Sequence, residues 1–290
     1  MKLAVFGNTG QLGAALVDEA AARGIQVAGF GSADVEITDL AAVERALESS
    51  QATVAVNATA AHVVPECEQQ PERAFAVNAA AVKRLAEACQ TRGIGLVTYS
   101  TDYVFDGAKG TPYVEDDAPR PLQTYGVSKL AGEQLCALFH PGALVVRTCG
   151  VYGGSSGSRA KKGNFLLNLL RDTQDRTELE VSSEQIVNPT YALDLARASL
   201  DLIGRGAAGG VYHLASEGHC SWAEFAAAAM AVAGRATKIV PVDRGGNSGA
   251  ARRPKFSALA NRRAAALGVV LPGWRDGLTR YLETLAVRRP

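Results

Sequence analysis

The chain has 290 residues, 47% of them hydrophobic, and its 29 acidic and 30 basic side chains leave a formal net charge of +1. This balance argues against nucleic acid or a membrane surface as a partner, and no apolar run is long enough to cross a bilayer. Five scattered cysteines without Cys-x-x-Cys spacing are expected to stay reduced in the cytoplasm and to bind no metal.

Short apolar segments alternate with helical patterns along the first half of the chain. A glycine-rich turn follows the first apolar segment and leads into an alanine-rich helix that reaches residue 23. The predicted strands are residues 3–6, 25–30, 53–57, 95–100 and 143–148, and the later helices are residues 40–49, 71–92 and 125–140. This alternation predicts a doubly wound, Rossmann-like α/β fold with a parallel sheet covered on both faces. The polar motifs that follow these strands should meet at one edge of the sheet.

The pattern becomes less regular after residue 150. We expect a loop at residues 153–163, strands at residues 179–181 and 211–214, and helices that begin at residues 165, 222 and 274. Residues 1–150 are therefore predicted to form a dinucleotide-binding domain. Residues 151–290 are predicted to form mainly a smaller α/β substrate-binding lobe, with some segments returning to the Rossmann sheet.

Three glycines follow the first predicted strand with the spacing Gly-x-x-Gly-x-x-Gly. Glycines at such a turn let the backbone approach a pyrophosphate closely, and the helix that follows offers free N–H groups to it. Because the turn follows the first strand of an alternating chain, it predicts a dinucleotide cofactor. The predicted contacts are Gly7, Thr9, Gly10, Gln11, Leu12 and Gly13.

The choice between NADP(H) and NAD(H) depends on the residues after the second predicted strand. An acidic residue about 20 positions beyond the glycines would bind the ribose 2′-hydroxyl of NAD. Ser32 stands there instead and could contact a 2′-phosphate, so NADP(H) is favoured and NAD(H) stays open. Asp39 allows two interpretations, because it could bind the adenine edge or cap the helix that follows it.

Tyr125 and Lys129 are four residues apart in a predicted helix, which places both side chains on one face. An ammonium group beside a phenol lowers the pKa of the phenol, so Tyr125 is predicted to donate a proton near neutral pH. The spacing alone is common, but here it follows the glycine-rich turn and Ser100-Thr101-Asp102. The order of these three motifs indicates a catalytic acid.

These motifs, in this order, resemble those of the extended short-chain dehydrogenase/reductases, and further segments narrow the resemblance to dTDP-4-dehydrorhamnose reductases. Residues 100–107, S-T-D-Y-V-F-D-G, are similar to the S-T-D-Y-V-F-x-G segment of that family. Residues 57–60, 77–78, 185–190 and 253–257 also resemble family motifs, so the resemblance covers nearly the whole chain.

The resemblance implies a role for each matching position. Thr101 would hold the substrate carbonyl, Tyr125 would protonate its oxygen, and Lys129 would bind the nicotinamide ribose and tune Tyr125. Further contacts along the cofactor would come from Asn57, Ala58, Thr59, Asn78 and Ser100. Contacts to the nucleotide sugar would come from Thr101, Asp102, Val104, Gln185, Asn188 and Arg253.

Some positions depart from the family pattern. Cys149 and Gly150 stand where the family commonly has Ser-Trp, and the lost aromatic ring should widen or reshape the sugar pocket. Pro65, Glu184 and Val187 also replace residues of family motifs. These departures leave the reducing residues intact, but they leave the identity of the 4-keto sugar open.

The leading hypothesis is NAD(P)H-dependent reduction of a 4-keto nucleotide sugar, with the proton supplied by Tyr125. One alternative is a nucleotide-sugar epimerase or dehydratase on the same scaffold. Another is a non-catalytic, cofactor-binding regulatory subunit like that of methionine adenosyltransferase, because fold and cofactor motifs do not by themselves establish activity. The sequence leaves open whether the protein is a homodimer and whether a metal lies at a subunit contact.

Overall fold

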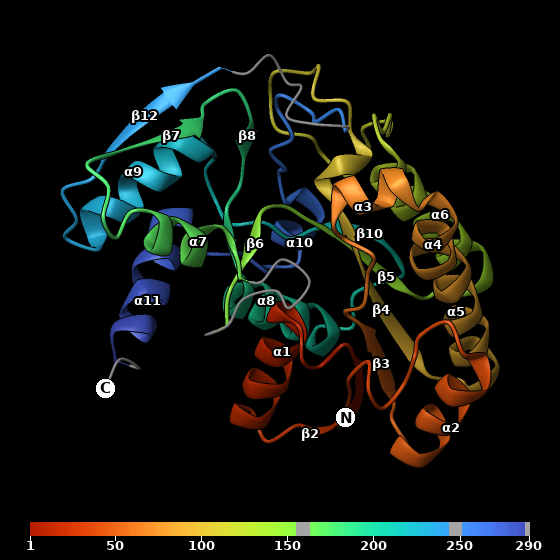
Figure 1. The fold of residues 1–290 in the computed structure, drawn as a ribbon. Coiled ribbons are helices and arrows are strands. Elements are labelled where there is room, and N and C mark those ends of the chain that lie inside the picture. The colour runs from red at the N-terminus through yellow and green to blue at the C-terminus, as the bar shows by residue number, and fades with distance from the viewer. Residues whose placement is uncertain (155–162, 244–250, 288–290) are drawn as a thin grey trace.

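The computed structural model describes residues 1–154, 163–243 and 251–287. Its centre is a six-stranded sheet in the order β10-β5-β4-β3-β1-β2, and every pair of neighbouring strands is parallel. This topology confirms the predicted doubly wound, Rossmann-like fold (Figure 1). The strands are β1 (Lys2–Phe6), β2 (Gln26–Phe30), β3 (Val54–Asn57), β4 (Gly95–Thr101), β5 (Leu144–Thr148) and β10 (Gly210–His213).

Helices cover both faces of the sheet, because successive strand residues point to opposite faces and both sets are apolar. Leu3 and Val5 of β1 lie in the core on one side, whereas Ala4 and Phe6 lie in the core on the other. The first side is covered by α1 (Gln11–Ala22), α8 (Ala192–Gly204) and α10 (Arg262–Ala266). The second is covered by α2 (Leu40–Ser50), α5 (Ala81–Arg92) and α6 (Thr124–Phe139).

Several helical regions differ from the sequence prediction, and α10 is among those that were not predicted. The helix predicted at residues 71–92 is divided into α4 (Pro71–Phe75), a π-helical segment η1 (Ala76–Ala80) and α5. Such π-helical turns occur mostly at functional sites. Helix α8 has no counterpart among the predicted elements. Its buried residues pack against the sheet and α1, while Asp194, Arg197 and Asp201 lie along a polar face.

A smaller lobe with its own apolar core lies beside the sheet (Figure 1). It contains α7 (Phe165–Asp172), β7 (Glu178–Ser182), α9 (Trp222–Val232), β12 (Lys238–Val242) and α11 (Trp274–Val287). Strands β7 and β12 pair with each other, whereas β10 pairs with β5 in the main sheet. Among the described residues, no helix has the length and hydropathy that a membrane span requires. The domain boundary at residue 150 stays a prediction.

Shorter elements connect the lobe to the sheet. Strand β6 (Val151–Tyr152) follows β5 directly and pairs with β9 (Thr190–Tyr191), which leads into α8. Strand β8 (Ile186–Val187) pairs with β11 (Cys220–Ser221), which precedes α9. These pairs place the chain after β5 beside the carboxyl edge of the sheet.

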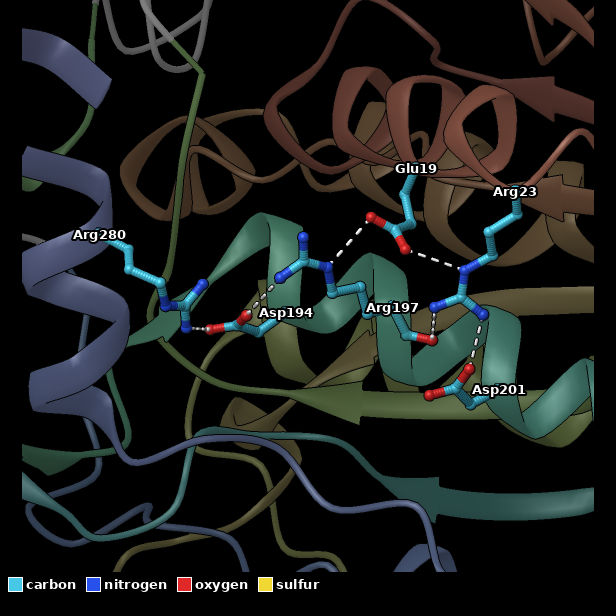
Figure 2. A network of polar contacts seen from close by, with 6 residues as sticks. All are labelled: Glu19, Arg23, Asp194, Arg197, Asp201 and Arg280. Carbon is cyan, nitrogen blue, oxygen red and sulfur yellow. Dashed lines mark hydrogen bonds and ion pairs between the residues drawn. The ribbon is translucent and has the colours of Figure 1, made fainter. Parts of the chain in front are cut away.

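A network of ion pairs joins α1, α8 and α11 across one side of the molecule (Figure 2). Glu19 of α1 accepts from Arg23 at 2.9 Å and from Arg197 of α8 at 3.0 Å. At the other end, Arg280 of α11 lies 2.6 Å from the buried carboxylate of Asp194. The network therefore links the helix that follows the glycine-rich turn to the smaller lobe.

Candidate active site at the carboxyl edge of the sheet

The glycine-rich turn lies directly after β1 and is closed by backbone contacts. Gly7 has a positive φ of 84°, and its N–H donates to the carbonyl of Phe30 at 2.8 Å. A Cβ on Gly13 would lie 2.1 Å from the carbonyl oxygen of Gly7, so no larger residue fits there. Helix α1 begins at Gly10 without a side-chain cap from any described residue. Its first N–H groups can therefore bind an anion, and the turn fits a dinucleotide pyrophosphate.

The Gln11 side chain contacts the protein itself rather than the space above the turn. Its Oε1 accepts from the backbone N–H of Gly153 at 3.0 Å and from Asn164 Nδ2 at 3.1 Å. Asn164 also donates to the hydroxyl of Tyr281 at 2.9 Å. These bonds use Oε1 only, and the contact of Gln11 with the cofactor stays a prediction. This anchor to the smaller lobe is absent from the sequence prediction, because its partners lie more than 140 residues away.

The end of β2 shows where the second half of a dinucleotide would lie. Ser32 is exposed there, as a contact to a 2′-phosphate requires. Asp34 closes the same turn by accepting from the backbone N–H of Gly31 at 2.8 Å. Asp39 accepts from Ala42 N at 3.1 Å and is the N-cap of α2. Of the two interpretations of Asp39, the structure confirms the helix cap, and the adenine contact stays a prediction, because Asp39 is exposed and only its Oδ1 forms the cap.

Asn57 shapes the loop after β3 instead of reaching into the groove. Its Oδ1 accepts from the Thr59 hydroxyl at 2.6 Å and from the Thr59 N–H at 3.1 Å, while its Nδ2 donates to Thr98 at 3.3 Å. The Ala58 backbone lies against Gly7, where a Cβ on that glycine would be 3.0 Å away. The predicted cofactor contact at Asn57 is therefore corrected to a structural role for its side chain, which leaves Ala58 and Thr59 beside the glycine-rich turn.

Asn78 connects the same loop to the helix of the predicted catalytic pair. Its amide accepts from Ala61 N and donates to Ala61 O, both at 2.9 Å, and it also donates to Ser128 Oγ at 3.0 Å. Ser128 in turn donates to the carbonyl of Tyr125 at 2.8 Å. The predicted cofactor contact at Asn78 is thus corrected, because the buried amide supports the site from beneath.

Helix α6 presents Tyr125 and Lys129 on one buried face, as the four-residue spacing predicts. Two glycines let the helix approach its neighbours closely. A Cβ on Gly126 would lie 2.2 Å from the Tyr103 carbonyl, and one on Gly132 would lie 2.1 Å from the Asn78 carbonyl. Close packing leaves the Lys129 side chain only 5% exposed.

The Tyr125 side chain interacts with that of Thr101, and its ring meets the ring of Tyr103 edge to face at 6.1 Å. Burial raises the pKa of Tyr125, which corrects the prediction that Lys129 lowers it. Burial likewise lowers the pKa of Lys129 to about 8. Loss of hydration on burial is therefore the largest cause of both pKa shifts.

Thr101 is held by Asp102 on the side away from Tyr125. The Thr101 hydroxyl lies 3.1 Å from Asp102 Oδ1, and Ser257 donates to Asp102 Oδ2 at 2.5 Å. The Cys149 thiol contacts the same carboxyl group, and burial raises the pKa of Asp102 to about 6. The predicted substrate contact at Asp102 is therefore corrected: its side chain is buried and orients Thr101.

We expect the wild type to lose stability as the pH rises, and we expect Asp102→Asn to be free of this loss. Because folding raises the pKa of Asp102, the stability it contributes is complete below its unfolded pKa of 3.8 and is lost as the pH rises through about 6. The wild type should thus lose roughly 2–3 kcal/mol relative to Asp102→Asn between pH 4 and pH 6.5. Urea unfolding of both proteins across this range measures the difference.

A second variant checks the cause of this pH dependence. Ser257→Ala removes a hydrogen bond that lowers the pKa of Asp102, so its stability should continue to fall at higher pH than in the wild type. Parallel stability curves for the wild type and Asp102→Asn would show that Asp102 ionises as readily in the folded chain as in the unfolded chain.

Two predicted substrate contacts are used by the protein for packing. Val104 is completely buried in a core cluster that includes Leu259, so its side chain is closed to a ligand. The Asn188 amide donates to the carbonyl of Gly218 at 2.8 Å and to that of Ser216 at 3.2 Å, and accepts from Leu259 N at 2.7 Å. Both predictions are corrected, because these side chains join loops around the site.

Arg253 lies next to the catalytic pair, whereas Gln185 is more deeply buried. The Arg253 guanidinium hydrogen-bonds the Tyr103 side chain, whose ring contacts Tyr125. Its buried Nε has no hydrogen-bond partner among the described residues, which leaves a donor for an anionic ligand. Gln185 is 3% exposed, and its substrate contact stays a prediction, as does the cofactor contact of Ser100, whose buried hydroxyl has no described partner.

The surroundings of Gly150 are partly filled by another aromatic side chain. Gly150 has a φ of 57°, and a Cβ there would lie 3.4 Å from the ring of Trp222. Trp222 comes from the first turn of α9 and packs on Phe165 with ring centroids 4.7 Å apart. The absence of an aromatic residue at position 150 is therefore offset in part by Trp222, a contact that sequence analysis did not include.

The registers of the parallel strands bring these groups together. Phe6 pairs with both Phe30 and Asn57, and Thr101 pairs with Thr148, so these five strands end at one edge. The glycine-rich turn, the exposed Ser32 and the Thr101–Tyr125 pair all follow these strand ends. This is the edge at which doubly wound sheets bind ligands.

Comparison with known proteins gives consistent matches along the whole chain. Residues 1–287 match the family model described as the RmlD substrate binding domain. A dTDP-4-dehydrorhamnose reductase of Mycolicibacterium smegmatis is 36% identical over 280 residues, which cover 96% of this chain and 84% of that protein.

Two solved structures of proteins named dTDP-4-dehydrorhamnose reductase share the fold. The one from Clostridium acetobutylicum has a TM-score of 0.92 and 31% identity, and the match covers 99% of this chain and 100% of that one. The one from Bacillus anthracis, solved in complex with NADP, has a TM-score of 0.90 and 31% identity, with 98% and 99% of the chains covered.

Proposed function

This chain belongs to the family of the RmlD substrate binding domain, and we propose that it reduces dTDP-4-dehydrorhamnose, or a close 4-keto nucleotide sugar, with NADPH. It is an oxidoreductase whose substrate is a nucleotide-linked keto sugar. The membership rests on a match to nearly the whole chain, and the cofactor is favoured by the relative solved with NADP. The identity of the sugar and the roles of the individual residues are part of this proposal.

The interaction between the side chains of Tyr125 and Thr101 is the observation on which the mechanism depends. Two hydroxyl groups from different elements, α6 and β4, meet at the edge of the sheet beside the glycine-rich turn. Such a pair could hold one carbonyl oxygen if the Thr101 hydroxyl turned its proton from Asp102 Oδ1 to the substrate. Alignment of this oxygen with the cofactor accounts for much of the rate of a bimolecular reduction.

Tyr125 acts as the proton donor in this proposal. Its pKa is raised by burial, so the phenol keeps its proton at neutral pH and can give it to the carbonyl oxygen. Bound NADPH would supply the hydride that reduces the carbonyl carbon. Lys129 lies one helical turn away and would stabilise the phenolate that remains after proton transfer.

The other residues of the site would hold and orient the ligands. The N–H groups at the start of α1 would bind the pyrophosphate of the cofactor, and the exposed Ser32 would lie near its 2′-phosphate. Asp102 would fix the direction of the Thr101 hydroxyl. The unpartnered Nε of Arg253 would contact the diphosphate of the nucleotide sugar.

The alternatives receive less support from the geometry. A dehydratase needs an acid and a base beside Tyr125, but the Asp102 carboxyl is buried and bonded to Ser257 and Thr101, which does not favour a role as base. A non-catalytic cofactor-binding subunit would have no need for Tyr125, Thr101 and Lys129 to meet. Cytoplasmic location and a homodimer stay predictions.

The decisive assay follows NADPH oxidation with dTDP-4-dehydrorhamnose and with a panel of other 4-keto nucleotide sugars, and is repeated with NADH. We expect stoichiometric oxidation with at least one of these sugars and a preference for NADPH. Tightly retained NAD with interconversion of 4-hydroxy epimers would instead show an epimerase. Cofactor binding without turnover of any sugar would support the regulatory subunit.

A further inference from the structure

A third charged residue, Glu133, continues the face of α6 that carries Tyr125 and Lys129, at the same four-residue interval. It is 6% exposed, and the mechanism above gives it no role. Lys129 and Glu133 both line a small cavity of ≈10 Å³, and Ser100, whose hydroxyl is without a described partner, lies on its wall. This volume admits at most one water, so Lys129 is almost without solvent.

Glu133 is fixed in place by Arg147 of β5. The guanidinium donates from Nε to Oε1 at 2.9 Å and from Nη2 to Oε2 at 2.7 Å, and both side chains are 5% exposed. Arg147 also lies over the ring of Phe105 at 5.1 Å. A buried ion pair of this kind is commonly no more stabilising than apolar residues of the same volume. Stability alone therefore does not explain why an ion pair lies beside Lys129.

Two buried cations, Lys129 and Arg147, share one buried anion, Glu133. Lys129 and Arg147 are cationic, and Glu133 is the single negative charge that acts on Lys129 among the described residues. Burial lowers the pKa of Lys129 to about 8, and Glu133 opposes that shift. Without this carboxylate, desolvation and the second cation would both favour loss of the Lys129 proton.

The remaining ionisable groups around α6 face other residues. From η2 (Asp102–Val104), Asp102 and Tyr103 act on Tyr125, as does Cys67 of α3 (Val64–Gln69). Further along α6, the Cys136 thiol lies near Glu133, and Cys89 of α5 faces Cys136. In β4, the Tyr99 hydroxyl donates to Ser199 of α8. None of these groups replaces Glu133 as a counter-charge to Lys129.

We propose that Glu133 is a positioning residue for the reduction: its carboxylate, held by Arg147, keeps the buried Lys129 protonated beside Tyr125. The proposal rests on the proposed function, in which Lys129 acts as an ammonium group. Glu133 touches neither the substrate nor the cofactor. Its effect should appear in the pH dependence of catalysis, because loss of the Lys129 proton would set the alkaline limb of kcat/KM.

Two single variants break the same ion pair but change the charge near Lys129 in opposite directions. Glu133→Gln removes the anion, so the alkaline limb of kcat/KM should move down by about one pH unit. At pH 8.5 the rate would be roughly tenfold below the wild type, and at pH 6 within about threefold of it. Arg147→Gln leaves the carboxylate unopposed, so the limb should move to higher pH. Equal shifts of the limb in both variants would overturn the proposal, since a purely structural pair predicts that result.

The double variant Glu133→Gln/Arg147→Gln guards against misfolding, because two amides replace the ion pair without leaving a buried charge unpaired. We expect it to fold and to place the alkaline limb between those of Glu133→Gln and the wild type, because loss of the Arg147 cation offsets part of the loss of the carboxylate. A limb at or above that of the wild type in the folded double variant would overturn the proposal.

A titration that does not need turnover separates this proposal from the proposed function. NMR of ¹³Cε-labelled lysine, with Lys129 assigned from the spectrum of Lys129→Met, gives the pKa of Lys129 directly. We expect a value near 8 in the wild type and a lower value in Glu133→Gln. Without an effective counter-charge a buried lysine titrates at about 5–6, so such a value in the wild type would overturn the proposal even if no variant folded. Failure of the wild type to reduce any keto sugar would remove the proposed function and leave this titration valid.

Discussion

Replacement of Tyr125 by phenylalanine is expected to lower kcat for the keto sugar by roughly 10²–10⁴-fold, the usual contribution of a positioned general acid. The phenylalanine ring keeps the edge-to-face contact with Tyr103, so the fold should be preserved. The hydroxyl that meets Thr101 is lost, and with it the proton for the carbonyl oxygen. Steady-state rates and a fluorescence titration with NADPH should show a large loss of kcat with cofactor affinity almost unchanged.

Tyr103 provides the matched control for this variant. It is a neighbouring half-buried tyrosine, but its side chain interacts with that of Arg253. Tyr103→Phe should therefore raise KM for the nucleotide sugar more than it lowers kcat. Wild-type kcat in Tyr125→Phe, or an equal loss of kcat in both variants, would mean that Tyr125 is not the acid.

Replacement of Gly13 by alanine should lower kcat/KM for NADPH by roughly 100-fold or more, the cost of displacing a binding group by about 1 Å. The new Cβ would lie 2.1 Å from the Gly7 carbonyl oxygen and 2.9 Å from Asn8 Cα, and both contacts are to backbone. Either the glycine-rich turn or the start of α1 must move, and both are predicted to hold the pyrophosphate. An NADPH titration of the folded variant measures the effect.

Gly204→Ala is the control for this substitution. Gly204 ends α8, and a Cβ there would meet nothing within 4 Å among the described residues. NADPH affinity and stability should both stay close to those of the wild type. A Gly13→Ala protein that binds NADPH as tightly as the wild type would show that the cofactor does not lie on this turn.

The central sheet is predictable from sequence because its strands are short apolar runs followed by glycine or polar residues. Leu3 to Phe6 can be buried on both faces only in a parallel sheet covered by helices, and the registers confirm that arrangement. Helix α8 was not predicted, although Asp194, Arg197 and Asp201 recur along one face at helical spacing. The π-helical turn at Asn78 was missed because its local sequence is that of an ordinary helix.

The partners of the site residues could not be predicted, since they come from distant parts of the chain. Ser257 reaches Asp102 across 155 positions, and this contact changes Asp102 from a substrate ligand into a support for Thr101. Motif resemblance predicted a substrate contact at Asn188, but the amide of this residue joins loops of the protein. Burial determines the direction in which the pKa of Tyr125 shifts, and the spacing of residues along a helix does not reveal burial.

The most direct test of the central claim is a crystal structure of the protein with NADP⁺ and the 4-hydroxy sugar nucleotide product. We expect the pyrophosphate on the glycine-rich turn at Gly7 to Gly13, and the hydroxyls of Tyr125 and Thr101 both within hydrogen-bond distance of the sugar O4. A complex in which O4 contacts neither hydroxyl, or in which the cofactor lies away from the carboxyl edge of the sheet, would contradict the account.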